Sequence, residues 1–182
     1  MKIIIALGNP GTKYEKTRHN VGWLILDLLI AGFELQNTNW QNKFNSEILE
    51  TSIKGQKFIF MKPQTFMNES GTAVKSIIDF YKLDPSRDIL VLHDEVDLPF
   101  GTIRSTDSSS SAGQNGVQDI IDKLGSQNFH RTRIGVETRA SRTEMDTKDF
   151  VLSNFSDEEI KKLQEEVFPK VKLEISRFVD KN

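Results

Sequence analysis

The opening stretch decides the fold: it reads MKIIIALGNPGTKYEKTRHNVG, residues 1–22. Its apolar run, Lys2 to Leu7, is rich in β-branched side chains and too short for a helix, which predicts a buried strand. The turn formers GNPG end this strand. The residues RHN then stand immediately before an apolar helical pattern. Because a strand end and a helix start often line one crevice in α/β proteins, we expect Asn9 and His19 to lie near each other.

Local structural roles are the alternative for these polar residues. Asn9 in a turn rich in glycine and proline usually caps its own backbone. His19 and Asn20, which precede a helix, are usually capping residues. The spacing by itself leaves both interpretations open.

The rest of the chain alternates between strand and helix patterns. Strands are predicted at residues 46–52, 57–61, 88–93, 101–105 and 131–137, and helices at 20–33, 70–81, 115–124 and 153–181. The first two of these strands flank Lys54-Gly55-Gln56 and form a predicted hairpin, with the second arm the more central one. Polar residues 37–45 and 106–111 predict loops. Asn68 is a candidate cap for the helix that follows it.

The terminal helical region carries its own boundary signals. Ser156 and Glu159 form a capping box at its start, and Pro169 is expected to kink or divide it. Strands that interleave with helices predict the α/β class. We expect a single domain, residues 1–182, with a mixed twisted central sheet and helices on both faces.

Composition narrows the classes of protein. The chain has 182 residues, no cysteine and a net charge of −2, so it has no disulfide, no thiol nucleophile and no thiolate metal site. No segment resembles a signal peptide or a membrane span, and we therefore expect a cytoplasmic protein. The candidate basic patch for nucleic acid is the segment 130–142, with ordinary surface arginines on an edge strand as the alternative; its arginines are Arg131, Arg133, Arg139 and Arg142.

Five separated motifs resemble the bacterial-type peptidyl-tRNA hydrolase family. They read ALGNPGTKYEKTRHNVGW (6–23), KPQTFMNESG (62–71), LVLHDEVDLPFG (90–101), AGQNG (112–116) and FVLSNFS (150–156). They occur in the family's order and span nearly the whole chain. The resemblance implies an enzyme that hydrolyses the ester bond between peptide and tRNA in prematurely released peptidyl-tRNA, which recycles the tRNA.

The resemblance also implies roles for individual residues. His19 would activate water, and Asp94 would fix the tautomer of its ring. Asn9 is the third expected catalytic residue, although which asparagine stabilises the oxyanion stays open. The residues expected to bind substrate are Tyr14, Met67, Asn68 and Asn115, and those expected to bind tRNA phosphate are Arg133 and Arg131. The expected partner is peptidyl-tRNA. We expect a monomer that uses no cofactor and does not bind a membrane. Asp94, Glu95 and Asp97 resemble a metal cluster, but no ligand loop accompanies them, so we expect no metal.

Two departures from the family pattern motivate an alternative. The family usually has a glycine-rich loop before Gly-Gly-His-Asn-Gly, whereas this chain has Ser108–Ser111 and then AGQNG, so that Gln114 replaces a histidine and cannot titrate. Thr106 stands where family members often have a basic residue. The alternative is an RNA-binding relative that has lost catalysis. A nucleotide-binding α/β protein is a third possibility, but the GNPG turn lacks the spaced glycines of a dinucleotide fingerprint.

Overall fold

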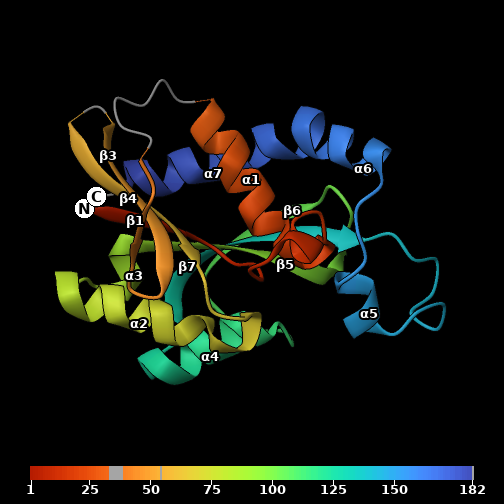
Figure 1. Ribbon diagram of the computed structural model, residues 1–182, viewed down its shortest axis with the longest axis horizontal. Coiled ribbons are helices and arrows are strands. Elements are labelled where there is room, and N and C mark those ends of the chain that lie inside the picture. The colour runs from red at the N-terminus through yellow and green to blue at the C-terminus, as the bar shows by residue number, and fades with distance from the viewer. Residues whose placement is uncertain (33–38, 54, 182) are drawn as a thin grey trace.

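The computed structural model describes residues 1–32, 39–53 and 55–181. They form one seven-stranded mixed sheet with the order β2-β3-β4-β1-β5-β7-β6, and helices cover both faces (Figure 1). The strands are β1 (Lys2–Ala6), β2 (Gln41–Lys43), β3 (Ser46–Ile53), β4 (Gln56–Pro63), β5 (Ile89–Pro99), β6 (Ile103–Ser108) and β7 (Asn128–Glu137). The α-helices are α1 (Val21–Ala31), α2 (Ser70–Tyr81), α3 (Pro85–Asp88), α4 (Asn115–Leu124), α5 (Thr147–Val151), α6 (Asp157–Lys162) and α7 (Phe168–Asp180). This architecture confirms the predicted fold class.

Strand β1 lies at the centre of the sheet and is buried on both faces. It pairs in parallel with β4 and with β5. Ile4 and Ala6 belong to the apolar cluster under α1 and α7, while Ile3 and Ile5 belong to the cluster over α2 and α4. In Figure 1 the first pair of helices lies above the sheet and the second pair below it. A strand covered on both sides must be apolar throughout, which is why its sequence shows no alternation.

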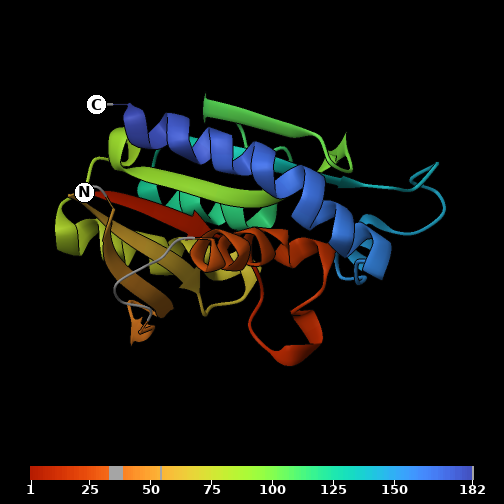
Figure 2. The same cartoon turned by 90° about the horizontal axis from the view of Figure 1, so that it is seen from above.

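The parallel strands bring three segments together at one edge of the sheet. Strands β1, β4, β5 and β7 run in the same direction, whereas β3 pairs antiparallel with β4, β6 with β7, and the edge strand β2 with β3. The turn after β1, the short 3₁₀ turn η3 (Met67–Glu69) after β4 and the second half of β5 therefore meet. Seen from above, the amino terminus and the end of α7 lie at the opposite end (Figure 2).

Some element boundaries differ from the sequence-based ones. Residues 41–43 of the predicted loop form β2 at the sheet edge. The expected loop 106–111 begins late, because β6 continues to Ser108 in pairing with β7. Strand β7 lies between β5 and β6, so it is not the edge strand of the alternative interpretation. Parts of three predicted elements lie outside the described residues: Phe33 of the helix, Lys54 of the hairpin turn and residues 37–38 of the loop.

The remaining boundaries follow the predicted signals. The hairpin of β3 and β4 forms, and β4 is the arm next to β1. Ser156 and Glu159 make the capping box of α6. A π-helical turn η4 (Leu163–Val167) separates α6 from α7, whose first turn contains Pro169. Proline cannot donate a backbone hydrogen bond, so the helix divides there. Among the described residues, no helix combines the length and the apolar character needed to cross a bilayer.

Gly22 allows α1 to start directly against the sheet. A Cβ atom at this position would lie 2.7 Å from the carbonyl oxygen of Leu92 and 2.8 Å from that of Leu7. Both contacts are to backbone, in β5 and directly after β1, and this backbone cannot move aside. Only glycine therefore permits this approach, and it holds the residues just before α1 close to β5.

We predict that Gly22→Ala lowers the free energy of unfolding by about 1–3 kcal/mol, the usual range for overpacking. Urea unfolding checks this value. Gly32→Ala is the matched control, because the nearest atom to a Cβ there is 3.4 Å away and the backbone is right-handed helical; this variant should keep or slightly raise the stability. Equal unfolding free energies for the two variants would contradict the role given to Gly22.

Candidate active site

A cleft of about 680 Å³ opens at the carboxyl ends of the parallel strands. Its wall is built from the turn after β1, from η3, from β5, from the start of α4 and from α5 with its preceding loop. The expected catalytic and substrate-binding residues all line it, and they are Asn9, Tyr14, His19, Met67, Asn68, Asp94 and Asn115. The structure therefore brings together residues that lie up to about a hundred positions apart, as the sequence predicted.

His19 and Asp94 meet at the floor of this cleft. His19 lies in the 3₁₀ turn η2 (Arg18–Asn20), directly before α1. Its Nδ1 lies 2.9 Å from Oδ2 of Asp94 on β5, and the two side chains are 12% and 2% exposed. Because Nδ1 is directed at the carboxylate, Nε2 is the ring nitrogen left to face the cleft. This is the tautomer in which Nε2 can accept a proton from water.

Burial and charge act in opposite directions on this pair. Burial disfavours the charged ring of His19, but the charge of Asp94 and its hydrogen bond outweigh burial and raise the pKa of His19 above its usual 6.5. Burial likewise disfavours the carboxylate of Asp94, yet the charge of His19 and the hydrogen bonds from His19 and Gln114 lower the pKa of Asp94. Asp94 is therefore ionised, and it stabilises the imidazolium that forms when His19 takes a proton.

The neighbouring histidine has no comparable role. His93 is fully buried, and its Nδ1 lies 2.8 Å from the backbone carbonyl of Asp94. Burial is the main reason that the pKa of His93 falls to about 4. The ring is therefore neutral, and it helps to hold the backbone of β5 at Asp94.

Asn9 is held in place by a network of amide hydrogen bonds. Its Oδ1 accepts a 2.9 Å hydrogen bond from the backbone N–H of Met67, which leaves its Nδ2 as a donor at the cleft. Asn20 donates through Nδ2 to the carbonyl of Asn9 and accepts from the N–H of Asn9. The side chain of Asn9 thus bonds to Met67 and not to its own turn. Asn20 stands at the N-cap position of α1, as the capping interpretation expected, but its side chain makes no cap hydrogen bond. Sequence reasoning gave Asn20 no part in the site, and only its place in the RHN motif pointed to one.

The other two asparagines lie at the rim of the cleft. Asn68 is in η3 and Asn115 is the first residue of α4, and both are exposed. Neither side chain caps its helix: Glu69 is the N-cap residue of α2, without a side-chain bond, and Gln114 caps α4. The cap expected at Asn68 is therefore absent from the start of α2. Both carboxamides are free to face a bound molecule.

The arginines expected to form a basic patch are each neutralised or buried. Arg131 is 1% exposed and donates to the carbonyls of Ser109 and Ser110. Burial is the main cause that lowers the pKa of Arg131 to about 10. This arginine anchors the serine loop, and its burial argues against the expected contact with tRNA phosphate. Arg133 remains available, since its side chain is 21% exposed while it pairs with Glu95 at 2.8 Å.

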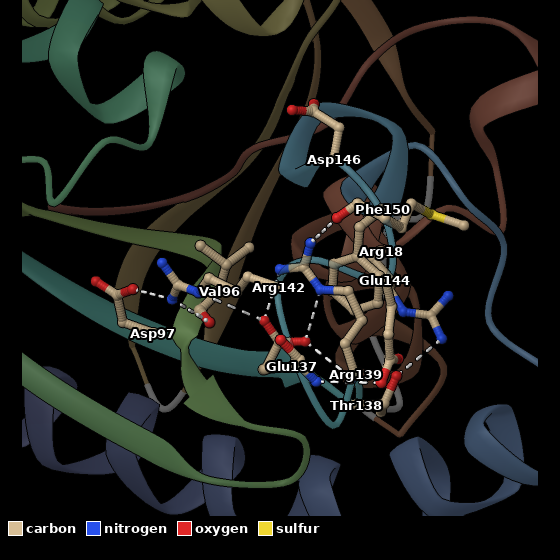
Figure 3. Close-up of polar contacts among 12 residues, drawn as sticks. Arg18, Val96, Asp97, Glu137, Thr138, Arg139, Arg142, Glu144, Asp146 and Phe150 are labelled. Carbon is tan, nitrogen blue, oxygen red and sulfur yellow. Dashed lines mark hydrogen bonds and ion pairs between the residues drawn. The ribbon is translucent and has the colours of Figure 1, made fainter.

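Two further arginines tie down the segment that closes one side of the cleft. Arg139 pairs with Glu137 at 2.6 Å and lies over the ring of Phe150. Arg142 reaches across to Asp97 and to the carbonyl of Val96 (Figure 3). These pairs join the segment 138–148 to β5 and β7.

Arg18, next to His19, extends this network to the carboxyl-terminal helices. Its guanidinium makes two hydrogen bonds to Glu159, at 2.7 and 2.9 Å, and lies between the rings of Phe150 and Phe155. Figure 3 shows the same side chain directed at Thr138. The turn that carries His19 is thus fixed to the segment that closes the cleft. Sequence reasoning did not single out Arg18.

The acidic residues of β5 have separate partners. Asp94 faces His19, Glu95 pairs with Arg133, and Asp97 pairs with Arg142. Within the described part of the chain, no three His, Cys, Asp or Glu side chains converge in a way that could hold a metal ion. The resemblance of these carboxylates to a metal cluster does not extend to their geometry.

The GNPG turn also differs from a phosphate-binding loop. The N–H of Asn9 is already bonded to Asn20, and α1 begins only at Val21. The turn leads into a single 3₁₀ turn, Thr12–Tyr14, and not into an α-helix whose start could bind a phosphate, which argues against the nucleotide-binding possibility.

Fold and site together define an α/β protein with a histidine–aspartate pair in a cleft rimmed by carboxamides. The family model described as peptidyl-tRNA hydrolase matches residues 3–182, and the chain belongs to this family. A peptidyl-tRNA hydrolase of Fusobacterium nucleatum is 46% identical over 165 residues, which cover 91% of this chain and 83% of the relative. One from Chloroflexus aggregans is 40% identical over 180 residues, covering 99% and 91%.

The fold agrees with solved structures of the family. The crystal structure of peptidyl-tRNA hydrolase from Acinetobacter baumannii aligns with a TM-score of 0.78 at 29% identity, covering all of this chain and 96% of the other. The match extends over every element of the sheet and the helices. The family resemblance seen in the motifs is therefore confirmed.

We predict that Asp94→Asn lowers the pKa of His19 below its usual 6.5, because burial then acts without the opposing charge. NMR titration of the His19 ring measures this. In the wild type the raised pKa means that protonation of His19 stabilises the fold fully below about pH 6.5, and that this stabilisation is lost as the pH rises through the folded-state pKa. Asp79→Asn, on the exposed face of α2, should leave the titration of His19 unchanged. An unshifted titration in Asp94→Asn would contradict the pairing.

Proposed function

We propose that this protein hydrolyses the ester that joins a peptide to the terminal ribose of tRNA. The observation that carries the proposal is the 2.9 Å approach of His19 Nδ1 to Asp94 Oδ2 at the floor of the amide-rimmed cleft. The names of the relatives supply the substrate class. The cleft supplies a base, an anchor for that base and neutral donors around them.

The base acts on water in this mechanism. Nε2 of His19 takes a proton from a water molecule as its oxygen attacks the ester carbonyl, and Asp94 stabilises the resulting imidazolium. No serine or cysteine is among the described residues that line the cleft, which favours water over a covalent intermediate. When the tetrahedral intermediate collapses, the bond to the ribose oxygen breaks, and the imidazolium returns its proton to that oxygen. The products are a peptide carboxylate and a free tRNA hydroxyl.

Asn9 is the best-placed donor for the oxyanion. Its Oδ1 is held by the N–H of Met67, so its Nδ2 is oriented before any substrate binds. A preorganised donor contributes more than one that must turn toward the developing charge. Asn68 and Asn115 lie at the rim of the cleft and are suited to contact the peptide and the ribose. Met67 lies on the peptide side of the cleft, and Tyr14 lies at its mouth.

Arg133 and Arg104 are the cations that we assign to the RNA backbone. Arg104 lies directly opposite Arg133 in the pairing of β6 with β7, so the two side chains share a face of the sheet. Arg104 is exposed, and it has no ion pair among the described residues. Like charges directly opposite each other are unfavourable, and Glu95 compensates only one of them. A phosphate between the two arginines relieves that repulsion. This contact also replaces the phosphate contacts that are missing at Thr106, which is not basic, and at Arg131, which is buried.

The remaining expectations follow from the substrate. Peptidyl-tRNA arises where ribosomes translate, so we infer a cytoplasmic location. The cleft is lined by residues of one chain, and we infer that a monomer suffices for activity.

We predict that His19→Ala lowers kcat for release of peptide from peptidyl-tRNA by roughly 10²–10⁴-fold, the usual contribution of a general base. Gel or scintillation assays of the released peptide measure it. His130→Ala is the control, because His130 pairs with Asp107 and is not among the described residues that line the cleft. If wild type and His19→Ala cleave at the same rate, His19 is not the base; if neither cleaves while both bind RNA, the non-catalytic alternative holds.

We predict that Arg104→Gln and Arg133→Gln each weaken RNA binding and reduce the slope of log K against log salt by about 0.7–0.9, the value for one lost phosphate contact. Binding of deacylated tRNA at several salt concentrations measures the slope. Arg177→Gln, on the exposed surface of α7, should leave it unchanged. A slope that stays at the wild-type value in both the Arg104 and the Arg133 variant would remove these arginines from the RNA contact.

A further inference from the structure

Gln114 touches the catalytic carboxylate directly. It is 7% exposed and stands immediately before α4, at the edge of the cleft. Its Nε2 lies 3.0 Å from Oδ1 of Asp94. Asp94 is therefore held on both oxygens, because Oδ2 faces Nδ1 of His19.

The helix that follows fixes which way the amide of Gln114 points. The backbone N–H of Val117 donates a 2.7 Å hydrogen bond to Oε1 of Gln114, which makes this glutamine the N-cap residue of α4. A helix start leaves several N–H groups without partners, so the oxygen of a capping side chain is held there. With Oε1 at the helix, the amide nitrogen can only face Asp94. A rotated amide would present an oxygen to the carboxylate and an N–H₂ to the N–H of Val117.

Every polar group of this side chain has a partner. Besides its bond to Asp94, Nε2 lies 3.2 Å from the thioether sulfur of Met67, a weak acceptor. A buried amide with all its bonds made is rigid, since any rotation leaves unpaired polar groups. The rigid frame of α4 is thereby connected to Asp94.

We propose that Gln114 is a positioning residue, which holds Asp94 ionised and aimed at His19 by means of an amide whose orientation the α4 cap enforces. The inference rests on the proposed hydrolysis. It assigns the family-atypical glutamine a role in catalysis instead of treating it as a sign of lost activity.

An amide suits this role at every pH. A neutral imidazole at this position also offers one acceptor and one donor, for the helix and for Asp94 respectively. A protonated imidazole loses the acceptor and the cap with it. Glutamine keeps both groups. The ionisable groups that act on Asp94 are then His19 and the buried His93, while the neighbouring Glu95 is paired with Arg133.

The test shortens the side chain by one methylene. Gln114→Asn keeps an amide and a preferred capping residue but withdraws the nitrogen from Asp94. We expect kcat to fall by about tenfold, as for the loss of one hydrogen bond to a charged group, while KM for peptidyl-tRNA stays unchanged. In the free protein, the low-field proton signal of His19 Nδ1–H should weaken or disappear, because Asp94 is no longer fixed.

The control makes the same change one turn further along α4. Gln118 bonds Ser111 and Asp122 and has no contact with Asp94, so Gln118→Asn should leave kcat and the His19 signal unchanged. Gln114→His is the rescue variant, and at pH 8 it should restore kcat to within about twofold of the wild type, since a neutral imidazole reproduces the donor and the acceptor.

The outcomes separate the possibilities. A raised KM with unchanged kcat in Gln114→Asn would show that Gln114 contacts the substrate. An unchanged kcat with an intact His19 signal would show that Gln114 only caps α4. Either result overturns the proposal. If the wild type cleaves no peptidyl-tRNA, the proposed function fails. The NMR signal still tests the link from Gln114 through Asp94 to His19, because it needs no substrate.

Discussion

The approach of His19 to Asp94 depends on how tightly α1 packs against the sheet. Parallel pairing of β1 with β5 places Ala6 beside Leu92, so the turn after β1 ends next to Asp94. His19 lies in the turn directly before α1, so α1 must then pack against these same strands. Gly22 makes this possible, because its missing side chain lets the helix backbone reach the carbonyls of Leu7 and Leu92. A bulkier residue would lift His19 from the carboxylate.

The site compensates for burying this pair with neutral hydrogen bonds. A carboxylate that is 2% exposed loses most of its hydration, and an unpaired one would take up a proton. His19 and Gln114 each bond one oxygen of Asp94. Amide groups also surround the rest of the cleft floor. Asn20 holds Asn9 by a hydrogen bond, and Asn9 in turn holds η3 by another. Amides add donors without adding charge, so the field of Asp94 on His19 is preserved.

Much of the fold could be predicted from the sequence, because its signals are local. The site residues were predicted only from the resemblance of separated motifs to a family, since the local spacing left capping roles open. The apolar run of β1 and the capping box at Ser156 each depend on residues next to them in the chain. The partners of single side chains could not be predicted, since they come from other parts of the chain. Nothing near Arg131 indicated that it would be buried under the serine loop. The pairing of Asn20 with Asn9 likewise depends on the turn folding back.

The distribution of charge explains how a chain of net charge −2 can serve an anionic substrate. Cations around the cleft are mostly held by acids: Arg18 by Glu159, Arg139 by Glu137, Arg142 by Asp97. These pairs fix the cleft walls, and they offer little net attraction to RNA. On the β6–β7 face, Arg104 and Arg133 stand together against Glu95 alone, and this is where we propose that the phosphate backbone binds. On this proposal, affinity for the phosphate backbone is separated in space from the pair formed by His19 and Asp94. Because of this separation, a cation that binds RNA does not compete with His19 for the carboxylate of Asp94.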